Sequence, residues 1–298
     1  MGSAIMAYAF DLEKDDEEDE QQQEEWIEDR EGLTQMGMVP MADMLNADAE
    51  FNAFINHGED CLTAVAVRDI AAGEEILNYY GPLASSELLR RYGYVTEKHA
   101  RYDVVDLSWG LIERGIKARF SGAVSDEDWK NVEKRVNADE DFEMEEGFVL
   151  ERTSEEPDSS GQVHGQAVFD GLPEELDEQV KVFLKAVKKV CPAVGEALGE
   201  KDTRNEIYLD CVLRALKERE AEYPTSLEED ERLFAGNDIA GGRRVQMAVW
   251  VRMGEKKLLR EAQAWVSGKL DELRGKMSST SRTRPAEDGQ PSAKRQRN

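Results

Sequence analysis

The spacing of apolar residues changes part-way along this chain, and the change limits the folds that it can adopt. Residues 33–95 carry short alternating segments interrupted by glycine and proline, a pattern that indicates strands and tight turns. Residues 96–270 carry apolar residues three and four positions apart, which indicates amphipathic helices. Strand segments followed by helical ones predict an α+β fold, with a first domain at 1–95 and a helical domain at 96–275.

The strand signals are clearest in CLTAVAVRDIAAGEEILNYYGP. Small and β-branched residues alternate at its start, Gly73 marks a turn, and a second strand runs through Ile76 and Tyr79. A Gly-Pro pair then ends the strand. We expect a short helix to follow, with Ser85 or Ser86 as its N-cap.

The helical part carries its own start and stop signals. Pro173 is placed to open a helix, since proline suits the first helical position. Thr225 and Ser226 each have a glutamate three residues on, so either can form a capping box. Residues 245–273 predict one long helix or two shorter ones, with Gly254 as the break in the second case.

Charge is unevenly distributed along the chain. The formal net charge is -26, from 64 acidic and 38 basic residues. Such a surface repels nucleic acid phosphates, so we expect no direct nucleic acid partner and favour a basic protein partner. A role in solubility alone explains the acidity equally well. Residues 13–31 are an acidic run expected to be disordered, and residues 276–298 are expected to be a disordered basic tail.

The sequence gives no support for a metal site, a disulfide framework or a membrane-spanning segment. Cys61, Cys191 and Cys211 lie far apart and form no CxxC pair, so we expect neither a metal site nor a disulfide framework. No apolar run reaches the length of a membrane span, and we expect a monomer away from membranes. The three histidines have polar neighbours and are interpreted as surface residues.

Two segments hold most of the residues able to carry chemistry, GMVPMADMLNADAEFNA and ILNYYGPLASSELLRRYGYV. The first contains Asn46 and Asn52 in apolar surroundings, and the second contains four tyrosines near tight turns. A buried tyrosine hydroxyl or asparagine amide needs hydrogen-bonding partners, so these side chains form either a polar-lined core or a cleft. The residues alone leave both interpretations open.

The order of these two segments resembles the C-terminal half of a SET domain. It is similar to the branch related to the Rubisco large-subunit methyltransferase and the fungal ribosomal-protein lysine methyltransferases. The matching stretches are MAYAFD, VPMADMLNAD, NYYGPLASSELLRRYGYV, YPTSLEEDERLF and MGEKKLLREA. The resemblance implies the C-terminal part of a β-rich SET fold followed by an all-α substrate-binding lobe. The opening Gly-x-Gly segment of a SET domain is not found, so we expect either a fragment that lacks the N-terminal SET half or a degenerate relative. In either case we expect this chain by itself to bind the cofactor poorly and to be inactive as a fragment.

The resemblance also implies roles for individual residues. Asn46 matches an asparagine that contacts S-adenosylmethionine, and Ala47 stands where the family has histidine. This difference matters little if the backbone makes the contact, and more if the imidazole is needed. Tyr80 matches the catalytic tyrosine near the transferred methyl group and is also a cofactor contact. Tyr92 matches a catalytic tyrosine of the lysine channel. Tyr94 matches the aromatic residue that packs on the adenine ring.

The implied function is transfer of a methyl group from S-adenosylmethionine to a lysine of a basic protein, with a ribosomal protein as the expected substrate. The terminal cluster SAKRQRN suggests a nuclear location, because short basic clusters act as import signals. Two alternatives remain open. One is a non-catalytic binding module for basic proteins, and the other is an acidic chaperone that acts through residues 13–31.

Overall fold

The computed structural model describes residues 7–13, 34–58, 61–138, 142–236 and 241–282. The predicted acidic insert therefore lies outside the described residues, except for Glu13. The described chain forms two compact units built from interleaved segments. The first unit comprises Met1–Asp106, Val149–Gly171 and Ala221–Glu261, and the second comprises Leu107–Phe148, Leu172–Glu220 and Ala262–Asn298. The boundary proposed between residues 95 and 96 remains a sequence-based prediction of the domain organisation.

Short two-stranded pairings build the first unit. Strands β1 (Phe10–Glu13) and β2 (Thr34–Gly37) pair antiparallel, as do β4 (Ala53–His57) and β5 (Leu62–Ala66). In contrast, β3 (Asn46–Ala47) and β6 (Leu77–Asn78) pair parallel, with Asn46 opposite Leu77. The predicted first strand and turn are thus confirmed as β5 and Gly73, which has a positive φ of 87°. The second strand is shorter than predicted, because β6 covers only Leu77–Asn78 and leaves Ile76 and Tyr79 outside it.

Helices complete this unit and form most of the second one. The first unit holds η1 (Ala42–Met44), α2 (Ser85–Tyr92), η2 (Lys98–Tyr102), α8 (Leu227–Ala235) and the start of α9 (Gly242–Arg282). The second unit holds α3 (Trp109–Arg119), α4 (Asp126–Asn137), α5 (Glu174–Val190), α6 (Pro192–Gly195), η3 (Ala197–Gly199), α7 (Lys201–Ala221) and the remainder of α9. Strands β7 (Val105–Ser108) and β8 (Gly147–Leu150) form a further pair.

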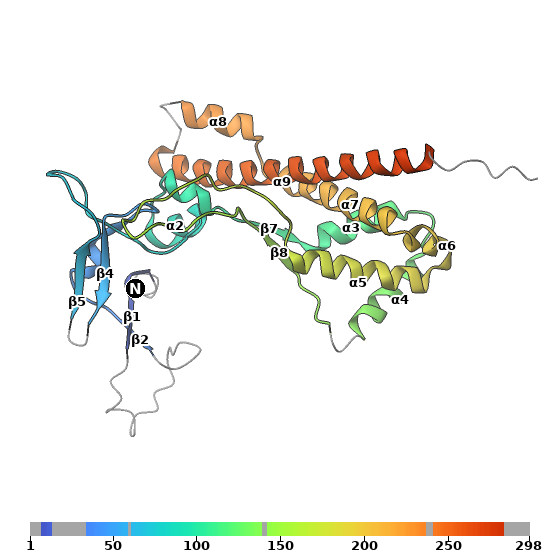
Figure 1. Cartoon of the computed structure of the whole chain (residues 1–298), viewed down its shortest axis with the longest axis horizontal. Helices are drawn as coiled ribbons and strands as arrows, with labels where there is room; N and C mark the ends of the chain where they lie inside the picture. The colour runs from blue at the N-terminus through green and yellow to red at the C-terminus, as the bar shows by residue number, and fades with distance from the viewer. Residues whose placement is uncertain (1–6, 14–33, 59–60, 139–141, 237–240, 283–298) are drawn as a thin grey trace, which may run out of the picture. The chain divides into compact units, whose positions relative to one another are not determined.

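The core of the second unit forms around one phenylalanine of α5. Phe183 is 1% exposed and lies edge-on to Trp109 of α3, with ring centroids 5.2 Å apart. Trp129 of α4 lies stacked against the same ring, with centroids 6.3 Å apart. The apolar stripe of α5 thus explains why α4 packs against α5 (Figure 1).

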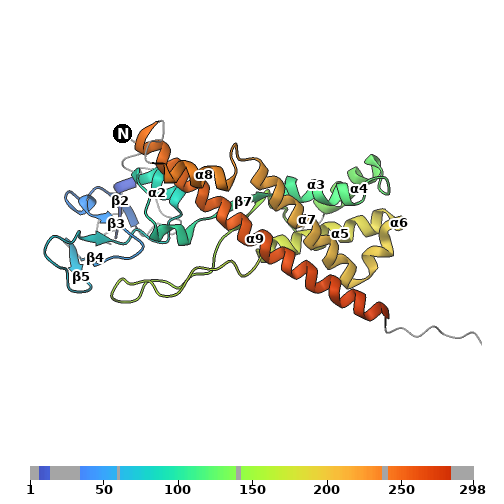
Figure 2. The same ribbon diagram turned by 90° about the horizontal axis from the view of Figure 1, so that it is seen from above.

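The predicted helix starts are largely confirmed. Pro173 is the N-cap of α5, and Ser226 forms a complete capping box with Glu229 at the start of α8. Figure 2 shows α8 beside the first turns of α9, where Leu227 packs on Val249 and Met253. The prediction for α2 is wrong, because Ser85 is its first helical residue and the N-cap is Ala84.

The buried carboxylate of Asp103 caps the N-terminus of α2 in place of an N-cap side chain. Asp103 is 2% exposed, and its Oδ1 accepts a hydrogen bond of 2.9 Å from the main-chain N–H of Ser85. Burial raises the pKa of Asp103, and the hydrogen bond from Ser85 opposes this rise. The free N–H of the first turn is therefore satisfied from a distant part of the chain.

Helix α9 is continuous, so of the two predicted alternatives the single long helix is found. It runs past Gly254 without a break and continues to Arg282, so residues 276–282 of the predicted tail are helical. Residues 283–298 of that tail lie outside the described residues. Gly254 has a packing role instead, because a Cβ there would overlap the carboxylate of Asp103.

We expect Gly254→Ala to destabilise the protein by about 1–3 kcal/mol, since Asp103 must rotate away and lose its charge-assisted bond to Ser85. Gly268→Ala in the same helix is the control. No atom lies within 4 Å of a Cβ at Gly268, so this change is expected to stabilise the helix by up to about 1 kcal/mol. Thermal unfolding followed by circular dichroism measures both. In an Asp103→Ala background Gly254→Ala should become neutral or stabilising, and persistent destabilisation there would contradict the explanation.

Candidate active site

Four tyrosines line a pocket of about 360 Å³ in the first unit, and three of them come from separate segments of the chain. Tyr80 follows β6, Tyr92 is the last residue of α2, and Tyr8 lies just before β1. The rings of Tyr80 and Tyr92 are 4.6 Å apart, and those of Tyr8 and Tyr92 are 5.5 Å apart. Other lining residues include Phe10, Asp43, Ile55, His57, Asn78 and Tyr79.

The parallel pairing of β3 with β6 fixes the position of Tyr80. The strands end close together, and the Tyr80 hydroxyl donates a 2.5 Å hydrogen bond to the carbonyl oxygen of Leu45. Burial raises the pKa of Tyr80 above its usual value, and the neighbouring Tyr94 and Tyr92 add to this effect. The phenol is therefore neutral near pH 7, with its proton engaged and its oxygen lone pairs left to accept.

Tyr92 and Tyr94 differ in what they contact. The Tyr92 ring lines the pocket, and burial raises the pKa of its hydroxyl. The Tyr94 hydroxyl donates to the carbonyl oxygen of Ala47 at 2.8 Å and accepts from the Ala47 N–H at 3.3 Å. Burial raises the pKa of Tyr94 to about 12, so this phenol also stays neutral. Tyr94 thus fastens the backbone of β3, and both main-chain groups of Ala47 are engaged.

Asn46 is not among the residues that line the tyrosine pocket. Its side chain is exposed and donates a 2.6 Å hydrogen bond from Nδ2 to Oε1 of Glu75. The structure therefore brings Tyr80 and Tyr92 together in one pocket and places Asn46 and Ala47 on the adjoining strand. The cofactor contacts of Asn46, Ala47 and Tyr94 remain predictions.

The side chain of Asn52 forms hydrogen bonds with the chain segment just before β6 and at its start. Asn52 is 1% exposed, and its Oδ1 accepts from the Leu77 N–H at 2.8 Å. Its Nδ2 donates to the Glu75 carbonyl oxygen at 2.8 Å and to Glu74 at 3.1 Å. A buried amide that satisfies three partners fixes where β6 begins, and so where Tyr80 emerges.

The surface interpretation of the histidines is wrong for His99, which is 0% exposed. Its Nδ1 lies 2.9 Å from Oγ1 of the nearby Thr96 and 3.3 Å from Oδ1 of Asp48, whereas its Nε2 is buried without a hydrogen-bond partner among the described residues. Burial raises the pKa of Asp48, but hydrogen bonds from His99, Thr96 and the Ala49 main chain together hold it below its usual value. His57 and His164 are exposed, as expected.

Sequence reasoning missed Tyr8 and Asp43 as pocket residues. Tyr8 lies in the MAYAFD segment, where a tyrosine between alanines was the available signal. No group of His, Cys, Asp and Glu in the described ranges is placed to hold a metal ion. We also find no membrane-crossing helix in the described part of the chain, since none is both long and apolar enough.

Comparison with known proteins identifies two family regions. The SET domain family matches residues 4–81, and the Rubisco LSMT substrate-binding family matches residues 172–259. In these two regions the chain is similar to SET-domain lysine methyltransferases. Its SET region contains the pocket residues Tyr8 and Tyr80, whereas Tyr92 lies just beyond that match.

Individual relatives agree with this assignment. Ribosomal lysine N-methyltransferase 4 of Saccharomyces cerevisiae is 40% identical over 124 residues, which cover 40% of this chain and 25% of that protein. N-lysine methyltransferase setd6 of Xenopus laevis is 29% identical over 284 residues, covering 86% of this chain and 56% of that protein. The chain thus spans between a quarter and just over half of the length of these relatives.

A solved structure shows the same fold. It is described as the SET domain of LSMT bound to lysine and AdoHcy, and it matches with a TM-score of 0.54 and 17% sequence identity. The match covers 92% of this chain and 55% of that one. Together with the two family regions, it confirms the predicted α+β class of SET fold with a helical substrate-binding lobe.

Proposed function

We propose that this chain takes part in methyl transfer from S-adenosylmethionine to a lysine side chain of a protein, at the tyrosine pocket. The supporting observation is the convergence of Tyr8, Tyr80 and Tyr92 on one pocket in a chain whose residues 4–81 match the SET domain family. SET methyltransferases use S-adenosylmethionine, and the matching LSMT structure contains AdoHcy and lysine.

The residues of the pocket suit a positively charged donor and an amine acceptor. Aromatic faces attract cations, and the Asp43 carboxylate lies among the lining residues. When bound, S-adenosylmethionine supplies an electrophilic methyl group on a positively charged sulfur. The side chains of Tyr8, Tyr80 and Tyr92 are the ones that would surround such a charge and limit the access of water.

Tyr80 is suited to orient the lysine amine and not to deprotonate it. Its raised pKa keeps the phenol protonated, and its proton is donated to the Leu45 carbonyl. Its oxygen can accept a hydrogen bond from an amine N–H, which aligns the nitrogen lone pair for attack. The lysine must reach the pocket neutral, and enclosure by aromatic rings lowers its pKa because burial disfavours the ammonium form.

We also propose a class of substrate and a cellular location for this activity. The net charge of -26 favours a basic, lysine-rich partner, and the similarity to ribosomal lysine N-methyltransferase 4 supports a ribosomal protein. The basic cluster SAKRQRN supports a nuclear location. We propose that the chain acts as a monomer on such a protein.

Tyr80→Phe is expected to lower methyl transfer about tenfold or more, because phenylalanine cannot accept the hydrogen bond that orients the amine. The assay follows transfer of a labelled methyl group from S-adenosylmethionine to purified ribosomal proteins. Tyr223→Phe is the control, since it removes a phenol bonded to Glu255 at 2.6 Å, outside the pocket.

The outcomes separate the proposed function from a binding role. Transfer that falls in Tyr80→Phe and is retained in Tyr223→Phe supports the proposal. Capture of ribosomal proteins without any transfer, unchanged in both variants, would favour a non-catalytic module. Calorimetric titration with S-adenosylmethionine reports in parallel whether this chain holds the cofactor by itself.

A further inference from the structure

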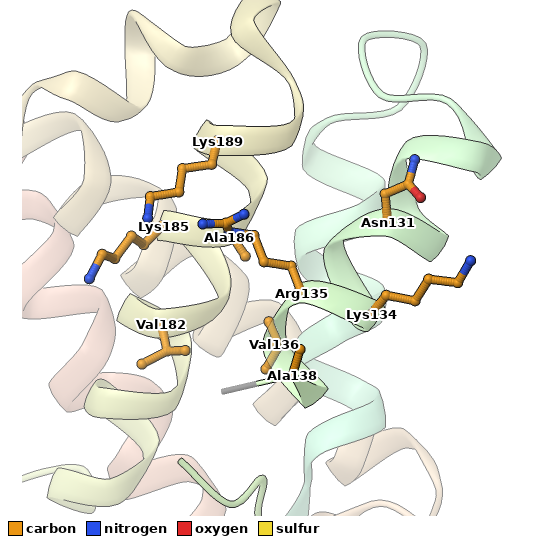
Figure 3. Close-up of a pocket in the computed structure, with 9 residues that line it drawn as sticks. All are labelled: Asn131, Lys134, Arg135, Val136, Ala138, Val182, Lys185, Ala186 and Lys189. Carbon is orange, nitrogen blue, oxygen red and sulfur yellow. The ribbon is translucent and has the colours of Figure 1, made fainter. Parts of the chain in front are cut away.

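Helices α4 and α5 of the second unit line a pocket of about 540 Å³ that carries four cationic side chains. Lys134 and Arg135 come from α4, and Lys185 and Lys189 come from α5 (Figure 3). Figure 3 shows Arg135 reaching from α4 towards Ala186 of α5. We call these four side chains and the hollow between them the basic groove.

The cations of the basic groove differ from others in the same unit. Lys117 forms ion pairs with Glu113 and Glu133, and Lys181 pairs with Asp177. By contrast, the described residues provide no carboxylate within ion-pair distance of Lys134, Arg135, Lys185 or Lys189. Within the described ranges, the basic groove is therefore a local concentration of positive charge without ion-pair partners, in a chain whose net charge is -26.

Favourable interaction with the helix dipoles explains the positions of only some of the four cationic side chains. Lys134 and Arg135 lie in the last turn of α4 and Lys189 in that of α5, where cations favour the helix dipole. Lys185 lies outside that turn, and as a like charge four residues from Lys189 it costs about 0.2–0.5 kcal/mol. A bound anion would remove this repulsion along with that between the two helices.

The floor of the basic groove is apolar. Val136 is 3% exposed and Ala186 is 5% exposed, and Val182 and Ala138 complete the floor. A ligand that fits both features has carboxylates for the cationic rim and a short apolar side chain for the floor. A single inorganic phosphate would use only the charges.

We propose that the basic groove binds an acidic peptide segment of a partner protein, in which carboxylates flank an aliphatic residue. None of the groove's lining residues in the described chain is aromatic, so stacking platforms for nucleic acid bases are absent there. The net charge of -26 also repels a long polyanion, whereas a short segment experiences mainly the nearby cations because salt screens charges beyond about 8–10 Å. This site is separate from the tyrosine pocket and does not depend on methyl transfer.

The test measures binding of a fluorescent peptide with alternating glutamate and leucine residues to the full chain by anisotropy. The double variant Lys185→Glu with Lys189→Glu is expected to weaken binding at least tenfold, because two attractions become repulsions. The matched control is Lys217→Glu with Lys269→Glu, which changes the net charge equally at exposed lysines outside the groove. The control should change affinity less than about twofold, since exposed charges at a distance are screened.

Circular dichroism on both double variants checks that the helices remain folded. Binding that weakens in the groove variant alone supports the proposal. Equal weakening in both variants would reduce the effect to net charge and overturn it. Tighter binding of a single-stranded RNA oligonucleotide than of the peptide, lost in the groove variant, would assign the groove to nucleic acid instead. Absence of peptide binding to the unmodified chain, or complete competition by millimolar inorganic phosphate, would also overturn it.

Discussion

Asp230→Ala is expected to reduce the free energy of unfolding by about 3–5 kcal/mol, because it leaves a buried ammonium without its counter-ion. Asp230 of α8 and Lys256 of α9 are both 0% exposed, and their charged atoms are 2.6 Å apart. Arg252 Nε donates to the same carboxylate at 2.9 Å, and Thr225 Oγ1 donates at 2.8 Å. Without Asp230, the partners that the described residues still offer Lys256 are neutral: the oxygens of Thr225 and the ring of Tyr223.

The pH at which this contribution disappears follows from the pKa of Asp230. Burial raises that pKa, but hydrogen bonds from Arg252, Lys256 and Thr225 together hold it below its usual value. A carboxylate with a lowered pKa stabilises the fold above its unfolded pKa, and the contribution is lost as pH falls through the folded value. The effect of Asp230→Ala should therefore be full at pH 7 and shrink only in strong acid.

Glu228→Ala is the control for Asp230→Ala. Glu228 lies on the same helix and pairs with Arg260 of α9, but both side chains are exposed, at 58% and 40%. Exposed ion pairs contribute little, so the unfolding midpoint should barely move. Urea denaturation followed by circular dichroism compares the two variants at pH 7. Equal shifts would mean that Lys256 and Asp230 are solvated in solution, which would contradict the buried pair.

The contacts around Asp230 show which features could be predicted from the sequence and which could not. TSLEED correctly predicted a capping box, because a cap depends on residues three positions apart, and Ser226 with Glu229 provides it. The role of Thr225 could not be predicted, since it depends on Lys256, 31 residues further along the chain and on another helix. Local spacing gave the helices, whereas buried polar partners required the tertiary structure.

Some residues of the tyrosine pocket could likewise be predicted from the sequence, and others could not. The motif containing Tyr80 and Tyr92 placed both side chains near a turn, and the structure brings their rings together. Tyr8 was missed because it reaches the pocket only when the segment before β1 lies beside α2. The burial of His99 was missed for a similar reason, since its partner Asp48 lies 51 residues earlier. The polar residues that flank His99 in the sequence suggested a surface position, but the fold buries its side chain.

Gly161→Ala is expected to destabilise the protein by about 3 kcal/mol or more, through two effects that add. The backbone of Gly161 has a φ of 73°, a region that costs residues with a Cβ about 1–3 kcal/mol. A Cβ would also overlap the carbonyl oxygen of Phe51, whose N–H donates to the Gly161 carbonyl at 3.0 Å. Because the obstacle is backbone, relief requires the segment to shift and this bond to break.

Gly165→Ala separates the two effects, since Gly165 lies in the same loop with a φ of 68° and only Glu155 within 4 Å of a Cβ, at 3.9 Å. It should cost only the backbone term, about 1–3 kcal/mol. The Phe51 ring stacks on Tyr79 at 5.1 Å, and Tyr79 lines the tyrosine pocket, so Gly161→Ala should also weaken ligand binding there. Thermal unfolding of the two variants, with S-adenosylmethionine titrated into each, measures both consequences. Matching losses in the two variants would show that the Phe51 contact is not formed, because the difference between them rests on that contact alone.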